Sequence, residues 1–260
     1  MLTSTVDLNC DMGEGMDSDA DIFPFISSVN IACGSHAGDA DTMRRTVEWA
    51  LRHHAAIGAH PSYPDKENFG RVDMLGQGLT AEEIPVIVVN QLIALQAICD
   101  EFGALLHHVK PHGALYNRAA RDASVAALIC RAIREFDPAL QLYGLSGSVM
   151  QQEAVKQGLV FVSEVFADRS YQPDGSLTPR NMPGALIPDT RTSVDQVLRM
   201  IGSGKVMAGN VEIPILADTI CLHGDGDHAV EFAAAIYEAL TLRGIAIEAP
   251  QSATPEPHRH

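Results

Sequence analysis

The sequence is poor in basic residues. Its 260 positions hold 18 lysines and arginines against 33 aspartates and glutamates, which gives a formal charge of −15. Nucleic acids and anionic membranes need a basic protein face that neutralises their phosphates, so we expect neither as a partner. The most apolar stretch, residues 84–98, is interrupted by Asn90, Gln91 and Gln96. It is shorter and more polar than a membrane-spanning helix requires.

Several common catalytic signatures are also missing. The sequence contains no G-x-x-x-x-G-K-[S/T], no G-x-G-x-x-G, no H-E-x-x-H and no G-x-S-x-G. These absences argue against an ordinary P-loop, a dinucleotide fold and a serine triad. The five cysteines are odd in number and form no C-x-x-C pair, which indicates reduced thiols. Because no signal peptide begins the sequence, we expect a cytoplasmic protein.

Short apolar segments alternate with longer amphipathic ones along the whole chain. The expected strands are Val6–Leu8, Val29–Ala32, Ala56–Ala59, Leu105–Val109, Gln141–Tyr143, Val160–Val165, Thr219–Leu222 and, more weakly, Ile245–Ile247. The expected helices are Asp39–His54, Thr80–Phe102, Ala123–Glu135, Val149–Gln157, Ser193–Ile201 and Asp227–Arg243. This alternation predicts an α/β fold whose parallel strands are joined by helical crossovers.

The distribution of polar residues favours a closed barrel over an open sheet. Nearly every expected strand is followed directly by a loop rich in Asp, Asn, His, Lys or Glu. In a barrel all these loops meet at one mouth, whereas an open sheet concentrates function in one or two loops. We predict a single barrel domain over residues 1–250 and a disordered tail over 251–260. The segment Tyr171–Pro188, rich in Pro and Gly, is interpreted as an active-site loop.

The first two loops carry acids, small residues and a histidine. Asp7, Asn9 and Asp11 alternate, so an extended backbone places them on one face, where they could bind a metal or act as a base. An Asx-rich turn is the alternative. In the second loop His36 lies at the tip. There Asp39 suits a helix N-cap, and Cys33 suits a buried position better than a nucleophilic one.

Histidines and a lysine follow the third and fourth expected strands. His60 comes just after an apolar strand and before a proline turn. His108, Lys110 and His112 share a face if residues 105–110 form a strand. Such a lysine can bind a carboxylate or have its pKa lowered for proton transfer, and His112 suits metal binding or acid–base chemistry. A solvated charged edge is the competing interpretation.

Two later loops add an acid, an arginine and a histidine. Glu164 follows an apolar run and should point into the mouth, and Arg169 could hold a substrate carboxylate. Structural ion pairs, Asp168–Arg169 or Glu164–Lys110, explain these residues equally well. His223 could form an acid–base pair with Asp225, and Asp227 suits the N-cap of the last helix.

Together the loops resemble a known family. The matching motifs, in order, are DLNCDMGEG (7–15), NIACGSHAGD (30–39), GAHPSYPD (58–65) with FGR (69–71), HVKPHGALYN (108–117), EVFADRSY (164–171) and LHGD (222–225). They resemble the LamB/YcsF family, which is the family of the A subunits of 5-oxoprolinase. Cys10 departs from the pattern, where a small residue such as alanine is expected; a buried position would tolerate it.

The resemblance implies a distorted barrel of about seven strands, similar to the glycoside hydrolase and deacetylase barrels. It implies ATP-dependent opening of 5-oxo-L-proline, a small lactam, to L-glutamate, together with the B and C subunits of 5-oxoprolinase. ATP with Mg would be a co-substrate of that complex, activating the amide oxygen before water attacks. A base, a proton donor for the ring nitrogen and a cation for the carboxylate are then needed.

Roles can be distributed over the matched positions. Asp11 or Glu14 could be the base, Lys110 or His112 the proton donor, and Arg169 or Lys110 the carboxylate partner. Glu164 completes the expected catalytic group. The expected substrate contacts are Asn9, His36, Arg71, Asn117, Arg169 and His223.

The resemblance to deacetylases further suggests a divalent metal held by Asp11, His60 and His112. Three functions stay open: a catalytic component of 5-oxoprolinase, a stand-alone metal-dependent amide hydrolase or deacetylase, and a non-catalytic component that binds the lactam.

Overall fold

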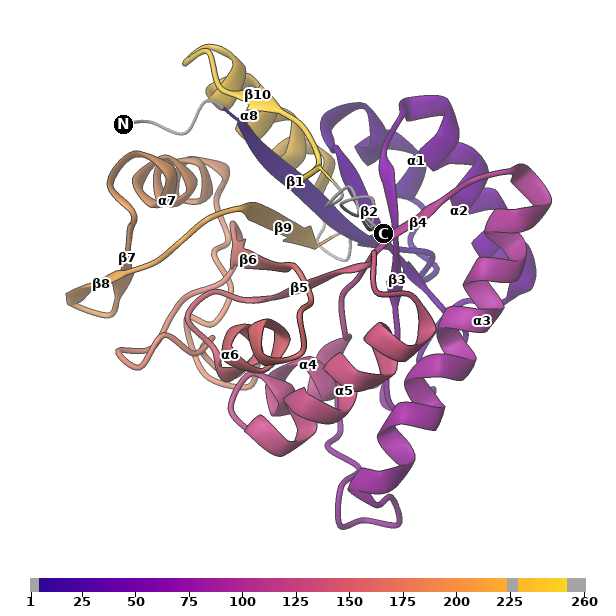
Figure 1. Cartoon of the computed structure of the whole chain (residues 1–260). Coiled ribbons are helices and arrows are strands. Elements are labelled where there is room, and N and C mark those ends of the chain that lie inside the picture. Colours follow the sequence, from indigo (N-terminus) through magenta and orange to yellow (C-terminus); the bar gives the residue numbers. More distant parts are fainter. Residues whose placement is uncertain (1–4, 224–228, 252–260) are drawn as a thin grey trace, which may run out of the picture.

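Seven parallel strands form a closed ring in the computed structural model, which describes residues 5–223 and 229–251 (Figure 1). They are β1 (Thr5–Met12), β2 (Ser28–Ala32), β3 (Ala56–His60), β4 (Leu106–Val109), β5 (Gln141–Leu145), β6 (Phe161–Phe166) and β9 (Thr219–His223). The last strand of the ring, β9, pairs with both β6 and β1. This closure confirms the predicted barrel and excludes an open sheet. A short strand, β10 (Ala246–Ile247), pairs with the start of β1.

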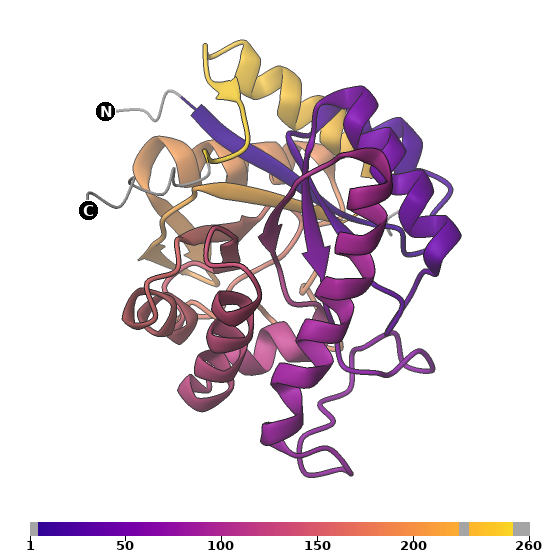
Figure 2. The same cartoon turned by 45° about the vertical axis from the view of Figure 1, so that its right-hand side comes forward.

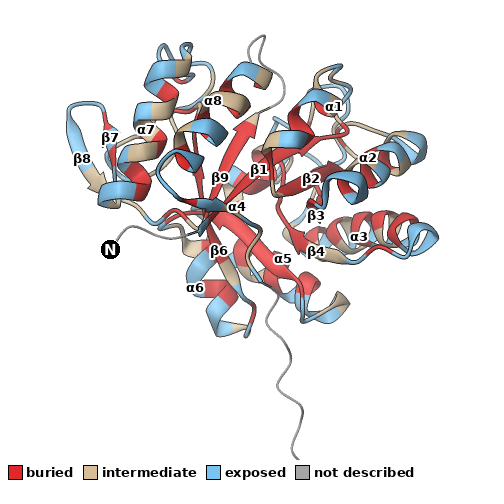
Figure 3. Ribbon diagram, turned by 90° about the horizontal axis from the view of Figure 1, so that it is seen from above, coloured by how far each residue is buried: buried red, intermediate tan, exposed pale blue. Residues whose placement is uncertain are grey.

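Helices surround the ring with their buried sides turned inward, as the view from above shows (Figure 3). They are α1 (Asp19–Ile22), α2 (Ala40–His53), α3 (Ile84–Phe102), α4 (Gly113–Ala119), α5 (Ala123–Phe136), α6 (Val149–Lys156), α7 (Thr190–Ser203) and α8 (Ala229–Thr241). Two 3₁₀ turns, Phe23–Phe25 and Ala81–Glu83, precede β2 and α3. The turned view shows the helices of the first half against one side of the barrel (Figure 2).

Helix termini follow the expected capping chemistry. The side chains of Asp39 and Asp122 accept hydrogen bonds from backbone N–H groups in the first turns of α2 and α5. Thr80 and Glu83 form a capping box before α3, and Gly103 ends that helix in the left-handed conformation. The predicted cap Asp227, together with Asp225 and His228, lies outside the described residues.

Several structural elements were not predicted, among them α1 and the 3₁₀ turn that follows it. Helix α4 begins within the HVKPHGALYN motif, where the sequence pattern indicated only a loop. Strands β7 (Lys205–Ala208) and β8 (Val211–Pro214) form an antiparallel hairpin outside the ring. Its turn, Gly209–Asn210, is a typical two-residue hairpin signal. The strands are too short for the alternation of apolar and polar residues to stand out.

Helix α3 is unusually long and apolar for a helix on the outside of a barrel. With the preceding 3₁₀ turn it runs from Ala81 to Phe102, which is long and apolar enough to cross a membrane by length and composition. The expectation that this stretch is too short was therefore wrong. One face, which includes Val88, Leu92 and Leu95, is completely buried. Packing against the barrel accounts for the apolarity of this face, whereas Val86 and Ile93 on the same helix are exposed.

The barrel interior is polar along β1. Asp7, Asn9 and Asp11 point inward, as their alternation predicts, and all three are buried. Asp7 accepts hydrogen bonds from the hydroxyls of Ser28 and Thr219, each at 2.6 Å. Cys10, on the opposite face of the strand, is fully buried. This is the environment in which a cysteine in place of a smaller residue was expected to be tolerated.

The C-terminal segment covers the amino-terminal end of the barrel. The Nε2 of His107, near the start of β4, lies 2.8 Å from the carbonyl oxygen of Pro250. Gln141, at the start of β5, donates to the carbonyl oxygen of Gln251 at 3.0 Å. These contacts place residues 250 and 251 at the end of the barrel opposite to the strands' carboxyl ends.

Gly58→Ala is expected to reduce stability. Gly58 lies opposite His108 in the β3–β4 register, and a Cβ at position 58 would overlap the His108 ring. That ring is fixed by a 2.8 Å hydrogen bond to Asn30 Oδ1 and by stacking on Tyr143. We expect a loss of about 1–3 kcal/mol in the free energy of unfolding, measured by urea denaturation. Gly202→Ala, on an exposed position of α7, is the matched control and should be neutral or stabilising. Equal midpoints for the two variants would contradict this packing.

Candidate active site

A pocket of about 920 Å³ opens at the carboxyl ends of the barrel strands. Its floor includes Asp11 at the end of β1, His60 at the end of β3 and His223 at the end of β9. Part of the wall is supplied by residues 172, 174–177 and 179–181. The segment Tyr171–Pro188 therefore contributes to the pocket, as its interpretation as an active-site loop predicts. The volume is near the upper end of the roughly 300–1,000 Å³ typical of small-molecule sites.

The pocket differs in charge from the rest of the chain. Its basic lining residues are Arg71, Lys110, Arg121, Arg169 and Arg180. Its acidic lining residues among those described are Asp11, Glu14 and Asp174. A locally basic pocket in a chain with a net charge of −15 favours an anionic ligand.

Lys110 is the centre of a buried charged cluster beside this pocket. Its Nζ lies 2.8 Å from Asp11 Oδ1 and 2.7 Å from Glu164 Oε1. It also donates to the Sγ of Cys221 at 3.0 Å. The ammonium group therefore donates hydrogen bonds to Asp11, Cys221 and, at 3.3 Å, Asn9 Oδ1, while its contact with Glu164 is an ion pair. The predicted Glu164–Lys110 ion pair is therefore present, and Lys110 fixes the position of Asp11.

Neighbouring charges keep Lys110 and Asp11 ionised despite their burial. Burial alone would lower the pKa of Lys110, but the Asp11 and Glu164 carboxylates and Cys221 raise it well above its ordinary value. Burial alone would raise the pKa of Asp11, but His60 and Lys110 hold it well below its ordinary value. A lysine tuned for proton transfer needs a lowered pKa, so this environment suits an electrostatic anchor instead.

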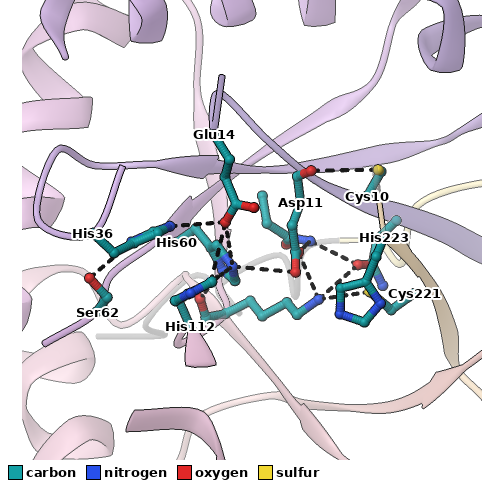
Figure 4. Close-up of polar contacts among 12 residues, drawn as sticks. Cys10, Asp11, Glu14, His36, His60, Ser62, His112, Cys221 and His223 are labelled. Atoms are coloured by element: carbon teal, nitrogen blue, oxygen red, sulfur yellow. Dashed lines mark hydrogen bonds and ion pairs between the residues drawn. The ribbon is translucent and has the colours of Figure 1, made fainter. Parts of the chain in front are cut away.

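Three imidazoles converge on Glu14 next to that cluster (Figure 4). Glu14 Oε1 lies 2.9 Å from His36 Nε2, 3.2 Å from His112 Nδ1 and 3.8 Å from His60 Nε2. The rings of His36 and His112 stack with their centroids 3.7 Å apart. Burial lowers the pKa of His36 to about 4 and also lowers the pKa of His112. His60 links the two clusters, because its Nε2 lies 3.4 Å from Asp11 Oδ2.

His223 is oriented by a carboxylate. Its Nδ1 lies 2.8 Å from Asp168 Oδ2 and 3.0 Å from Oδ1. Because a carboxylate at neutral pH accepts hydrogen bonds, we assign the proton to Nδ1, which leaves the Nε2 lone pair free. The His223 ring stacks on Phe166, and both line the pocket. A histidine oriented in this way can accept and return a proton. Its predicted partner Asp225 lies outside the described residues.

Other predicted site residues divide into buried and pocket-lining groups. Asn9 and Glu164 are fully buried and do not line the pocket, and His36 lies behind Glu14. Arg71 and Asn117 are exposed and line the pocket. Of the predicted metal set, His60 lies near both Asp11 and Glu14, whereas His112 lies with Glu14 and Asp11 Oδ1 contacts Lys110.

Arg169 connects the barrel to the loop that follows it. Its guanidinium donates to the carbonyl oxygens of Thr178 at 2.6 Å and of Ala185 at 3.3 Å. Asp168, the alternative ion-pair partner of Arg169 in the sequence analysis, pairs with His223. Arg169 lines the pocket while it holds the loop in place.

The residue that the predicted site lacked is Asp168. It was considered only as an ion-pair partner of its neighbour, because a pairing between the ends of β6 and β9 is not visible in the sequence. Those strands are adjacent in the ring, with Phe166 paired with Cys221. The signal available in the sequence was the position of Asp168, two residues after the end of β6, and of His223 at the end of β9.

Ionisable side chains gathered at the carboxyl ends of the strands of a parallel β/α barrel are the arrangement found in the active sites of β/α-barrel enzymes. Residues 6–255 match the LamB/YcsF family. The chain belongs to that family, as the resemblance predicts. It is 51% identical over 251 residues to a Brevibacillus brevis protein named as the A subunit of 5-oxoprolinase, with 94% of this chain and 98% of that one covered.

Solved structures agree with this placement. The crystal structure of a lactam utilization protein from Thermus thermophilus is 43% identical, with a TM-score of 0.87, and covers 94% of this chain and 99% of that one. A family 4 carbohydrate esterase from Streptomyces lividans is 12% identical, with a TM-score of 0.50, over 98% of this chain and 100% of that one. The second likeness concerns the fold alone and agrees with the predicted similarity to deacetylase barrels.

Proposed function

We propose that this chain is the A subunit of an ATP-dependent 5-oxoprolinase, which opens 5-oxo-L-proline to L-glutamate together with its B and C subunits. One observation carries the proposal. A chain half identical to the A subunit of a 5-oxoprolinase carries a basic pocket with the oriented histidine His223 at its floor. A hydrolase acting on a lactam needs both features, because the substrate is an anion and the attacking water must lose a proton.

The pocket side chains suggest how the ring is opened. His223 Nε2 takes a proton from water as the water oxygen bonds to the carbonyl carbon. The ring C–N bond then breaks, and the same proton passes to the departing nitrogen. The arginines of the pocket, including Arg71 and Arg180, would stabilise the substrate carboxylate and the negative charge that develops on the amide oxygen.

ATP, with Mg, is proposed as the co-substrate that activates the amide. The sequence has no P-loop, which supports a nucleotide site on one of the partner proteins or at an interface. A pocket larger than one small lactam, with several arginines, suits a lactam that carries the γ-phosphoryl group of ATP on its amide oxygen after ADP has left. When the first water has opened the ring, this group remains on the new carboxyl as an acyl phosphate, and a second water releases it as inorganic phosphate. All five cysteines are free, which supports a location in the reducing cytoplasm.

Reconstitution tests the proposal directly. Glutamate release from 5-oxoproline should require this chain, the B and C subunits, and ATP in one mixture. The controls omit each component in turn. Glutamate release by this chain alone, without ATP, would instead support a stand-alone amide hydrolase. This is the second candidate function, and the histidines around Glu14 favour it. No release from the complete mixture would contradict the proposed substrate.

A further inference from the structure

We propose that this chain binds one divalent transition-metal ion through a carboxylate and three imidazoles. The four side chains are Glu14, His36, His60 and His112. One potential ligand atom from each lies within 4.8 Å of the others. Three of them line the floor of the pocket, and His36 is buried behind them. The proposal concerns metal binding itself and does not depend on the substrate proposed above.

The hydrogen bonds of two rings determine where their lone pairs point. His60 Nδ1 lies 2.8 Å from the carbonyl oxygen of Lys110, and His112 Nε2 lies 2.9 Å from the carbonyl oxygen of Phe69. A carbonyl oxygen can only accept, so each of these nitrogens carries a proton. The other nitrogens, His60 Nε2 and His112 Nδ1, lie only 2.9 Å apart and present facing lone pairs when both rings are neutral.

Two facing lone pairs beside a carboxylate need a cation. Glu14 Oε1 lies 3.2 Å from His112 Nδ1 and 3.8 Å from His60 Nε2. Imidazole ligands of metals almost always donate their second N–H to a carbonyl, a carboxylate or water, and both rings do so here. Proton and metal ion are the two cations that could satisfy this arrangement.

The third imidazole favours the metal ion. His36 Nδ1 lies 2.9 Å from Ser62 Oγ, whose hydroxyl is 2.8 Å from the carbonyl oxygen of Tyr63. When that hydroxyl donates to the carbonyl, it accepts from His36, and the Nε2 lone pair faces Glu14 at 2.9 Å. A single proton shared by His60 and His112 leaves the contact between His36 Nε2 and Glu14 without a proton. One metal ion can instead be coordinated by all four side chains.

The dimensions agree with a small tetrahedral ion. Ligand atoms at about 2.0–2.1 Å from a tetrahedral zinc ion are about 3.3 Å from each other. Four of the six distances within the cluster, 2.9, 2.9, 3.2 and 3.8 Å, require shifts of about 0.5 Å or less. The other two join His36 to the two facing imidazole nitrogens, lie within 4.8 Å and require shifts of about 1.5 Å at most. Imidazole nitrogens with one carboxylate suit zinc and its neighbours rather than magnesium or calcium. Such an ion would supply a Lewis acid at the pocket floor.

The proposed ligand set differs from the set that the resemblance to deacetylases suggests. His60 and His112 belong to both, but Glu14 replaces Asp11 and His36 is added. Lys110 and Asn30 both donate to Asp11 Oδ1, and Asp11 Oδ2 lies 3.4 Å from the Nε2 of one of the three imidazoles, that of His60. The group of ligand atoms that includes His60 and His112, all within 4.8 Å of one another, contains Glu14 in place of Asp11. The two sets predict different losses when His36 or Asp11 is changed.

Cobalt provides the probe. The full-length chain, stripped with a chelator, is titrated with Co²⁺ and followed by its visible absorption, and zinc content is measured separately after dialysis. We expect one ion per chain and the intense bands of tetrahedral cobalt. Zinc below one tenth of an ion per chain, with no such bands, would mean that a proton occupies the cluster and would overturn the proposal.

Matched variants then identify the ligands. Glu14→Gln and His36→Gln should weaken cobalt binding by more than about 100-fold, and Asp11→Asn should keep it at one ion per chain. His53→Gln, which changes an exposed histidine outside the cluster, is the control. Circular dichroism verifies that each variant is folded. Binding that survives His36→Gln but is lost in Asp11→Asn would overturn the proposed set in favour of the Asp11 set.

Discussion

Replacing His223 by Gln is expected to lower turnover of the assembled complex by about 10²–10⁴-fold, the usual contribution of a general acid–base group. Glutamine keeps much of the volume of the ring but cannot accept and return a proton at neutral pH. Asp168→Asn should lower turnover in the same direction, because Asp168 holds the His223 ring in its orientation. Glutamate release from 5-oxoproline with ATP measures the effect.

Folding is not expected to change with His223→Gln, because the side chain is partly exposed in the pocket. His53→Gln, on the surface of α2, is the matched control and should keep full activity. Lactam binding should persist in His223→Gln. Full turnover by a folded His223→Gln variant would rule out the proton-transfer role and favour a chain that only binds and presents the lactam.

Replacing Lys110 by Met is expected to cost about 3–5 kcal/mol in the free energy of unfolding, in addition to abolishing turnover. Methionine fills a similar volume, but Asp11 and Glu164 would then be left as buried carboxylates without their shared cation. Lys66→Met, at an exposed position, is the control and should change stability little. Guanidinium denaturation monitored by circular dichroism gives the difference.

A double variant separates charge from packing. If the cost arises from unpaired carboxylates, Lys110→Met combined with Glu164→Gln should be less destabilised than the sum of the two single variants. Additive losses would show that the methylene chain, rather than the charge of Lys110, matters. Stability of Lys110→Met equal to that of Lys66→Met would contradict the buried ion-pair network altogether.

The fold was predictable because local patterns determine it. Each ring strand was located within a few residues, since an apolar run followed by a polar loop is a local feature. The extent of β1 was underestimated: predicted as Val6–Leu8, it runs from Thr5 to Met12. Polar residues such as Asn9 and Asp11 interrupt the apolar pattern, and only their hydrogen-bond partners, distant in the sequence, explain why they are buried.

The site was predictable in position but not in its pairings. Strand-end loops identified Asp11, Lys110 and His112 because parallel strands in a barrel end at one mouth. Which carboxylate meets which histidine depends on side-chain rotamers and on strand neighbours distant in sequence. His223 is 55 residues from Asp168, and its pairing with that residue illustrates the limit.

The two ends of the described chain have a practical consequence for experiments with partner proteins. Thr5 opens β1 beside Ala246, and Gln141 at the start of β5 binds the carbonyl of Gln251. Both ends therefore leave from the side of the barrel that faces away from the pocket. A sensor surface or affinity resin linked close to Thr5 or Gln251 would leave the pocket mouth directed into solution. Capture of soluble partners on such a surface can thus be measured without the tether covering the mouth.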